Sequence, residues 1–206
     1  MQHAPEIRHV RPHETTVVAA MLARAFADDG MIDWLAGARG HEPDAVRNAR
    51  AASLFAGYLQ LLALPHGMAF TVDGLPGAAL WSPPGRWRMG PLTQLRMTPF
   101  FLATTGWRRL PPRFVAAQKI LAAHPATPHY YLQVLGVDPQ AQGQGWGRQL
   151  LQHGLTIADE ARMPCYLETM NADNVGFYVR YGFRLTGELQ LPFSGHRVWL
   201  MWRDAG

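Results

Sequence analysis

Cysteine and lysine are almost absent from this chain of 206 residues. Cys165 is the only cysteine, so no disulfide can form within the chain, as is usual for proteins of a reducing compartment. Lys119 is the only lysine, so the formal net charge of +4 rests on arginine. The sequence also lacks zinc-finger spacing, RNA-binding aromatic motifs and a basic helix. A nucleic-acid-binding domain is therefore the weakest interpretation of the basic charge, and an anionic small molecule fits that charge equally well.

Long apolar runs are missing too. No stretch approaches the roughly 20 apolar residues that a membrane-spanning helix needs. The first residues, Met1 to Glu6, lack the charged and apolar regions of a signal peptide. We therefore expect a cytoplasmic protein that contacts no membrane. Hydrophobic residues make up 48% of the chain, which is enough for the core of one domain over residues 1–206.

A strand, a glycine-rich turn and a helix start follow one another after residue 130. The apolar strand from Tyr130 to Val137 ends at the turn-forming pair Asp138-Pro139. The first N–H groups of a helix have no partner within the helix, and the helix dipole places partial positive charge there. Glycines at 143, 145 and 147 remove the β-carbons that would keep a ligand away from those groups. This arrangement predicts a phosphate site. The apolar face of the helix is formed by Leu150, Leu151, Leu155 and Ala158.

Four interpretations of this turn compete. A P-loop would need Gly-Lys-Ser/Thr where the sequence has Gly147-Arg148-Gln149. A dinucleotide fingerprint would need its third glycine at 148, where Arg148 stands. Glu168 lies at a suitable distance for the acidic residue of that fingerprint, but too few residues follow for a doubly wound domain. A pyrophosphate turn of the acyl-CoA type fits the pattern Gln142-x-x-Gly145-x-Gly147. A glycine-rich turn without a ligand is the remaining alternative.

The acyl-CoA pattern and a second block together resemble the GNAT acetyltransferase family. The family's phosphate loop reads Arg/Gln-x-x-Gly-x-Gly/Ala, and its second block spaces an Asn, a Tyr and a Gly-Phe pair as Asn171, Tyr178, Gly182 and Phe183 are spaced here. The resemblance covers the half of the chain from about His129 onward. Within the family, the runs 166–169 and 177–183 are most similar to the puromycin N-acetyltransferase-like branch.

Apolar periodicity predicts a mixed α/β chain. The resemblance implies an α/β (α+β mixed sheet) fold, with a mostly antiparallel central sheet flanked by helices and a V-shaped splay between the two central strands. Strands are expected over 7–11, 68–72, 78–81, 130–137, 165–170, 183–191 and 198–202. Helices are expected over 14–27, 31–36, 43–64, 112–123, from the glycine turn to 161, and over 174–181; 82–91 is a long loop, and 92–105 is mixed with breaks.

The resemblance also implies which residues hold acetyl-CoA. Main-chain groups near Leu135 and Val137 would bind the pantetheine arm and polarise the thioester. Asn171 would contact the cofactor, whereas Asn174 is expected to cap a helix. Arg148 opposes the helix dipole unless an anion binds beside it; a solvated arginine is the alternative. The full set is Leu135, Gly136, Val137, Gln142, Gly143, Gln144, Gly145, Trp146, Gly147, Arg148, Asn171, Asn174 and Tyr178.

Two side chains are candidates for proton transfer. Tyr178 is a phenol that is protonated at neutral pH and can protonate a departing thiolate, with Tyr181 as the competing phenol. Glu168 can take the proton of the acceptor amine directly or through water. A carboxylate that positions the substrate or pairs with an arginine is the alternative for Glu168. Cys165 is expected to be a buried strand residue, and we expect no metal site.

We therefore expect an acetyl-CoA-dependent N-acetyltransferase that moves an acetyl group by direct transfer to a primary amine of a small molecule, such as an antibiotic or other aromatic amine. A CoA-binding sensor or partner module with lost or altered catalysis is the alternative. The expected partners are acetyl-CoA and the amine, with no nucleic acid and no membrane; a homodimer is left open. An acceptor pocket is expected among Phe26, Trp34, Trp81, Trp87, Phe100, Phe101 and Trp107, and a solvated face among Arg86, Arg88, Arg108, Arg109 and Arg113.

Overall fold

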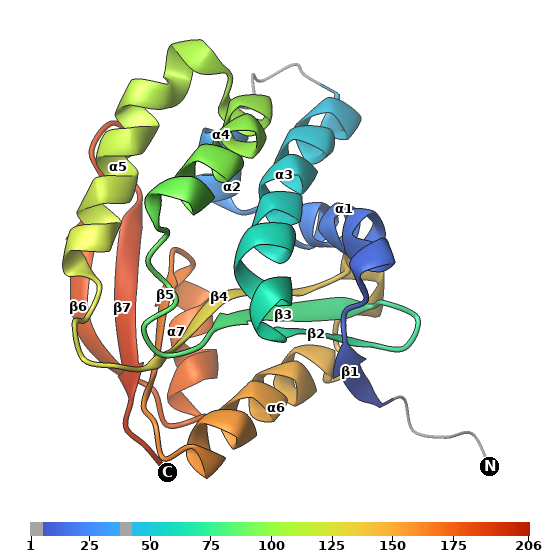
Figure 1. Cartoon of the computed structure of the whole chain (residues 1–206), viewed down its shortest axis with the longest axis vertical. Helices are drawn as coiled ribbons and strands as arrows, with labels where there is room; N and C mark the ends of the chain where they lie inside the picture. The colour runs from blue at the N-terminus through green and yellow to red at the C-terminus, as the bar shows by residue number, and fades with distance from the viewer. Residues whose placement is uncertain (1–5, 38–42) are drawn as a thin grey trace.

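The computed structural model describes residues 6–37 and 43–206. Within these ranges the strands form one seven-stranded sheet in the order β1-β2-β3-β4-β5-β7-β6 (Figure 1). Only β4 and β5 run parallel, and every other neighbouring pair is antiparallel. This is the expected mixed sheet. The strands are β1 (Ile7–His9), β2 (Ala69–Val72), β3 (Gly77–Ser82), β4 (Tyr130–Val137), β5 (Cys165–Thr169), β6 (Arg184–Gln190) and β7 (Arg197–Arg203).

Helices cover both faces of the sheet (Figure 1). None of the helices in the described ranges combines the length and the apolar character of a membrane span. The longer helices are α1 (Thr15–Ala25), α2 (Gly30–Ala36), α3 (Asp44–Tyr58), α4 (Pro91–Thr105), α5 (Leu110–Ala123), α6 (Trp146–Glu160) and α7 (Ala172–Val179). Short turns of helix are η1 (Pro12–Glu14), η2 (Leu59–Ala63), η3 (Leu64–His66), η4 (Trp107–Arg109) and η5 (Pro139–Ala141).

The central strands are buried on both faces. Ala78 and Leu80 of β3 pack into the core formed with α1 and α3, while Ala79 and Trp81 point to the opposite face, where α6 packs. Alternate side chains of one strand therefore serve two cores, as the period of two requires. Burial on both sides explains why these strands are apolar throughout instead of alternating with polar residues.

Two predicted helices differ from the structure. The helix expected over 43–64 is α3 followed by η2, a π-helical turn, which shifts the buried face so that Leu59 is fully buried and Leu61 is only half-buried. The stretch 92–105, expected to be broken, is the continuous helix α4 with Pro99 inside it.

The two parallel strands separate soon after they meet. β4 pairs with β5 at three positions only, from Tyr130 to Leu132. At the next residue, Gln133, the register between β4 and β3 shifts, because Leu80 lies opposite Val134 while Trp81 lies opposite Leu132. Such a bulge bends the strand that carries the extra residue. The bend confirms the splay between the central strands. From Gln133 to Val137, the β5-facing edge of β4 pairs with none of the described strands.

Candidate active site

A cleft of about 530 Å³ lies where β4 ends. We call it the turn cleft, because the glycine turn and the first residues of α6 form one side of it and α7 forms the other. Most of the residues expected to hold the cofactor meet here. The cleft is lined by Leu135, Val137, Ala141, Gln142, Gly143, Gly145, Trp146, Gly147, Arg148, Asn174, Phe177 and Tyr178.

The backbone of the turn needs glycine at its last residue. Gly145 is the N-cap of α6 and has φ 84°, a left-handed conformation that disfavours residues with a β-carbon. The side chain of Gln142 donates to the Val137 carbonyl at 3.3 Å, which ties the turn to the end of β4. Arg148 is exposed and has no carboxylate partner within the described ranges. The helix start therefore presents N–H groups beside a cation, which together fit a pyrophosphate.

Three of the predicted cofactor residues do not line the turn cleft. A β-carbon on Gly136 would lie 2.8 Å from the Leu22 side chain, so this glycine permits close packing of β4 on α1. Gln144 accepts a hydrogen bond from the Trp146 indole at 3.2 Å and is exposed. Asn171 accepts the Asp173 N–H at 2.9 Å and is the N-cap of α7.

The structure corrects the predicted helix cap. Asn171, expected to contact the cofactor, caps α7. Asn174, expected to cap a helix, stands inside α7 and lines the turn cleft. The prediction that Asn174 is the cap was wrong because the helix begins two residues earlier than the sequence pattern suggested.

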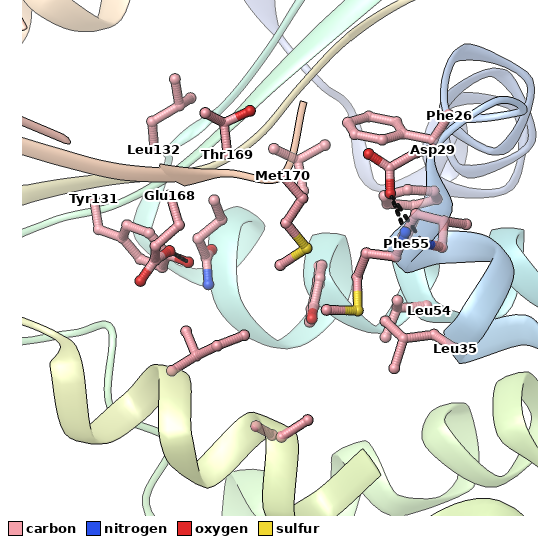
Figure 2. A pocket seen from close by; sticks show the side chains of 18 of the residues that line it. Phe26, Asp29, Leu35, Leu54, Phe55, Tyr131, Leu132, Glu168, Thr169 and Met170 are labelled. Carbon is pink, nitrogen blue, oxygen red and sulfur yellow. Dashed lines mark hydrogen bonds between the residues drawn. The ribbon is translucent and has the colours of Figure 1, made fainter. Parts of the chain in front are cut away.

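A second cavity of about 300 Å³ lies deeper between the sheet and helices α1 to α5. We call it the inner cavity; Figure 2 shows Glu168 beside Tyr131 on one side of it and Asp29 near Phe55 on the other. Leu135, Asn174 and Tyr178 line both spaces, so the turn cleft and the inner cavity meet at these side chains. Ligands in the two spaces would therefore contact the same three side chains.

Tyr178 stands at this junction. Its ring packs against Phe177 and Phe183, and its side chain is buried except for a small fraction. Burial raises the pKa of Tyr178 above its ordinary value, so the phenol keeps its proton throughout the neutral range. Tyr181, the competing phenol, is half-buried and lines neither space. Of the two phenols, Tyr178 is therefore the one that borders both spaces.

Glu168 belongs to a buried polar group at one end of the inner cavity. Its side chain is 6% exposed, its Oε2 accepts the Tyr131 hydroxyl at 2.6 Å, and its Oε1 lies 3.3 Å from His124 Nδ1. His124 Nε2 lies 2.9 Å from His129 Nε2, and His129 Nδ1 lies 2.6 Å from the Thr127 carbonyl oxygen. Burial raises the pKa of Tyr131 well above its ordinary value, with the Glu168 carboxylate adding to it, so Tyr131 remains a donor.

Two further polar groups of the inner cavity bind α2, and a third lacks a partner. Asp29 caps α2, accepting the Met31 and Ile32 N–H groups. Burial raises the pKa of the Asp29 carboxyl. Arg113 donates to the Trp34 and Leu35 carbonyls at the other end of α2. By contrast, the Oε1 of Gln133, at the β4 bulge, is buried and accepts no hydrogen bond from any described residue.

The predicted pocket aromatics divide into two groups. Phe26, Trp34, Trp87 and Phe101 line the inner cavity. Trp81 is fully buried in the core beneath α6, and Trp107 is 71% exposed and lies outside the cavity. Phe100 does not line the cavity either. Periodicity alone did not separate pocket from core because both are apolar.

Two further predictions concern single residues. Arg113, expected on a solvated face, is 8% exposed, and that prediction was wrong. Its side chain turns inward because it donates hydrogen bonds to two carbonyls of α2. Cys165 is buried as expected, and burial raises its pKa to about 12, which keeps the thiol protonated. Within residues 6–37 and 43–206, no three histidine, cysteine or acidic side chains cluster as metal ligands would.

Sequence reasoning missed the histidines of the site. His124 and His129 flank a short loop between α5 and β4, and neither belongs to a motif that a single sequence reveals. Their spacing of five residues, with two prolines close by, gave no periodic pattern. Gln133 was also missed, because a bulge that turns one strand residue toward a cavity has no signature within an apolar strand.

Residues 112–185 match the family described as acetyltransferase (GNAT) domain. This part of the chain is therefore similar to a GNAT acetyltransferase domain.

Similar proteins carry related names. The peptidyl-lysine N-acetyltransferase YjaB of Salmonella typhimurium is 34% identical to this chain over 65 residues. The matched stretch covers 32% of this chain and 43% of YjaB, which is less than half of that protein. An uncharacterized N-acetyltransferase of Schizosaccharomyces pombe, C550.08, is 24% identical over 199 residues, 93% of this chain and 79% of that protein. A crystal structure described as histone acetyltransferase HPA2 and related acetyltransferase, from Corynebacterium glutamicum, shares the fold with a TM-score of 0.70 at 21% identity, over 98% of this chain and 97% of that one.

Proposed function

We propose that this protein is an acetyl-CoA-dependent N-acetyltransferase that moves an acetyl group directly to a primary amine of a small molecule. The observation that carries the proposal is the meeting of two spaces at Leu135, Asn174 and Tyr178. One space is a helix start suited to a pyrophosphate, and the other is an apolar cavity with a carboxylate at its end. Direct transfer requires that thioester and amine meet at such a junction.

The turn cleft would hold acetyl-CoA, which supplies the activated acetyl group. The N–H groups of the first turn of α6 and the Arg148 guanidinium would bind the pyrophosphate. The unpaired edge of β4 near Leu135 and Val137 would bind the amides of the pantetheine arm as a neighbouring strand would. A preformed edge of this kind binds an extended ligand without first breaking any pairing within the protein.

Two side chains would move the protons. Tyr178 would give its proton to the departing thiolate, since it lines both spaces and remains protonated. Glu168 would take the proton of the acceptor amine, because it lies in the inner cavity near the splay, whereas Asp29, the other carboxylate there, caps α2. A general acid or base typically contributes about 10²–10⁴-fold to the rate.

The inner cavity favours an acceptor with an apolar, aromatic body. Its walls carry Phe26, Phe55 and Trp87, while Gln133 Oε1 offers an acceptor that no described protein group uses. An ammonium or amide N–H of the ligand would satisfy that oxygen, whose burial without a partner is costly. This chemistry agrees with the resemblance to the puromycin N-acetyltransferase-like branch, and an antibiotic or other aromatic amine is the substrate class we propose.

Thiol release from acetyl-CoA with a panel of amines tests the proposal. The panel comprises aromatic primary amines, aliphatic polyamines and a lysine-containing peptide, the last because one relative is named a peptidyl-lysine N-acetyltransferase. We expect the aromatic amines to give the highest kcat/KM. Preference for the peptide would overturn the substrate class. Binding of acetyl-CoA with no turnover of any amine would instead support the alternative of a CoA-binding sensor or partner module.

A further inference from the structure

The chain of hydrogen bonds from Thr127 to Glu168 requires an unusual number of protons. It consists of three contacts: the Thr127 carbonyl with His129 Nδ1, His129 Nε2 with His124 Nε2, and His124 Nδ1 with Glu168 Oε1. A carbonyl oxygen and an ionised carboxylate only accept hydrogen bonds, so both ends of the chain need donors. Two neutral imidazoles carry one N–H each, which makes two protons for three bonds. The chain is complete only when it holds a third proton.

The third proton belongs to the end of the chain at Glu168. Burial lowers the pKa of His129, with His124 adding to it, so His129 remains neutral and donates from Nδ1 to Thr127. His129 Nε2 is then an acceptor, and His124 must donate from Nε2. The contact between His124 Nδ1 and Glu168 Oε1 is therefore bridged by the extra proton, as an imidazolium that donates to the carboxylate.

We propose that His124 is a positioning residue that couples its titration to Glu168, so that the two side chains act as one base with the proton affinity of an imidazole instead of a carboxylate. Without the third proton, the Nδ1 lone pair of His124 faces the negative carboxylate, and this contact is unfavourable. Uptake of a proton restores the bond. The proposal rests on the proposed function for its kinetic consequence only.

The proton balance of the step is simple. An N–H bond of the bound ammonium breaks, and its electron pair stays on the nitrogen, which becomes the nucleophile. The proton bonds to Glu168 Oε1 and is shared with His124 Nδ1. An imidazole-like affinity is closer to neutral pH than that of an ordinary carboxylate, and a general base works best near the operating pH.

The surroundings protect this unit from water and from other charges. The Trp87 indole stacks on the His124 ring with centroids 3.6 Å apart, and the Arg88 guanidinium lies 4.7 Å from the Trp87 ring. Among the described residues, the other titratable groups that face His124 and Glu168 are phenols with raised pKa values and one neutral imidazole. They are Tyr58 on α3, Tyr131 on β4, Tyr166 on β5 and His129 before β4.

Nuclear magnetic resonance of ring-labelled histidine tests the proton count without any turnover. We expect the His124 ring to carry both of its protons at pH 6.5 in the wild type, because the contact with Glu168 needs a donor. In Glu168→Gln the titration of His124 should fall by at least about one pH unit, since an opposite charge at this distance shifts a pKa by roughly one to three units. A His124 ring that is already neutral at pH 6.5 would overturn the proposal, even if no amine were turned over.

The kinetic test uses His124→Gln, with His66→Gln as the matched control because His66 is exposed on η3. The pH dependence of kcat reports groups that titrate in the substrate complex. Its decline at low pH should move to lower pH by at least about one unit in His124→Gln and stay unchanged in the control. A purely structural role would lower kcat without moving this decline, and that result would also overturn the proposal. Unchanged acetyl-CoA affinity shows that the variant is folded.

Discussion

The indole of Trp81 lies where a β-carbon on Gly154 would stand: such an atom would be 2.3 Å from Cε2 and 2.4 Å from Nε1 of the indole. Trp81 is fully buried, so it has no room to move aside. We expect Gly154→Ala to lower the free energy of unfolding by about 1–3 kcal/mol through overpacking. Gly176→Ala on α7 is the control, because its β-carbon would meet no described atom within 4 Å. Denaturant titration of both variants checks the difference, and equal stabilities would contradict this packing.

The start of α6 offers a test of cofactor binding. A β-carbon on Gly147 would touch only Val137, at 3.5 Å, among the described residues, so Gly147→Val should fold normally. Its branched side chain would occupy the space where the pyrophosphate is expected, and the affinity for acetyl-CoA should fall at least about tenfold, or ~1.4 kcal/mol. Calorimetric titration measures this effect. Gly147 is better suited than Gly145, whose positive φ would strain any substituted side chain. Unchanged affinity in a folded protein would place the pyrophosphate elsewhere.

Tyr178→Phe removes one hydroxyl and almost no volume. If the phenol protonates the leaving thiolate, kcat should fall about 10²–10⁴-fold while the affinity for acetyl-CoA hardly changes. Because burial raises the pKa of Tyr178, the group stays protonated to higher pH than a free phenol, and the wild type should show no high-pH decline below about pH 10. Steady-state rates from pH 6 to 10 measure both effects. If kcat of the variant stayed within about threefold of the wild type instead of falling by that range, Tyr178 would have a packing role only.

Residues of α5 line the inner cavity, and one of them is the small residue Ala116. Ala116 is 2% exposed and lines the cavity, whereas Ala122 on the same helix is exposed to solvent and does not line it. Ala116→Leu should raise the KM for the amine at least about tenfold by filling the cavity, and Ala122→Leu should leave it unchanged. Neither change should alter the affinity for acetyl-CoA. If both variants kept the wild-type KM, the acceptor would have to bind outside the inner cavity.

The sequence predicted the sheet and the turn because both depend on local patterns. Apolar runs bounded by glycine and proline located the strands, and the residues at 143, 145 and 147 marked the start of α6. The inner cavity depends instead on contacts between distant segments. Glu168 meets His124 across 44 residues, and no periodicity records such a pairing. The inward turn of Arg113 likewise depends on where α2 packs.

The short parallel seam has a consequence for the order of folding. Strands β1 to β4 form one antiparallel block and strands β5, β7 and β6 another, with only three residue pairs joining them in the described sheet. Glu168 belongs to one block and its partner Tyr131 to the other. Such non-local pairs form late, because closing a long loop loses chain entropy before the stabilising contacts have formed. Enzymatic activity should therefore return after the helical circular dichroism signal during refolding, which makes the rate of acetyl transfer a reporter of the final docking step.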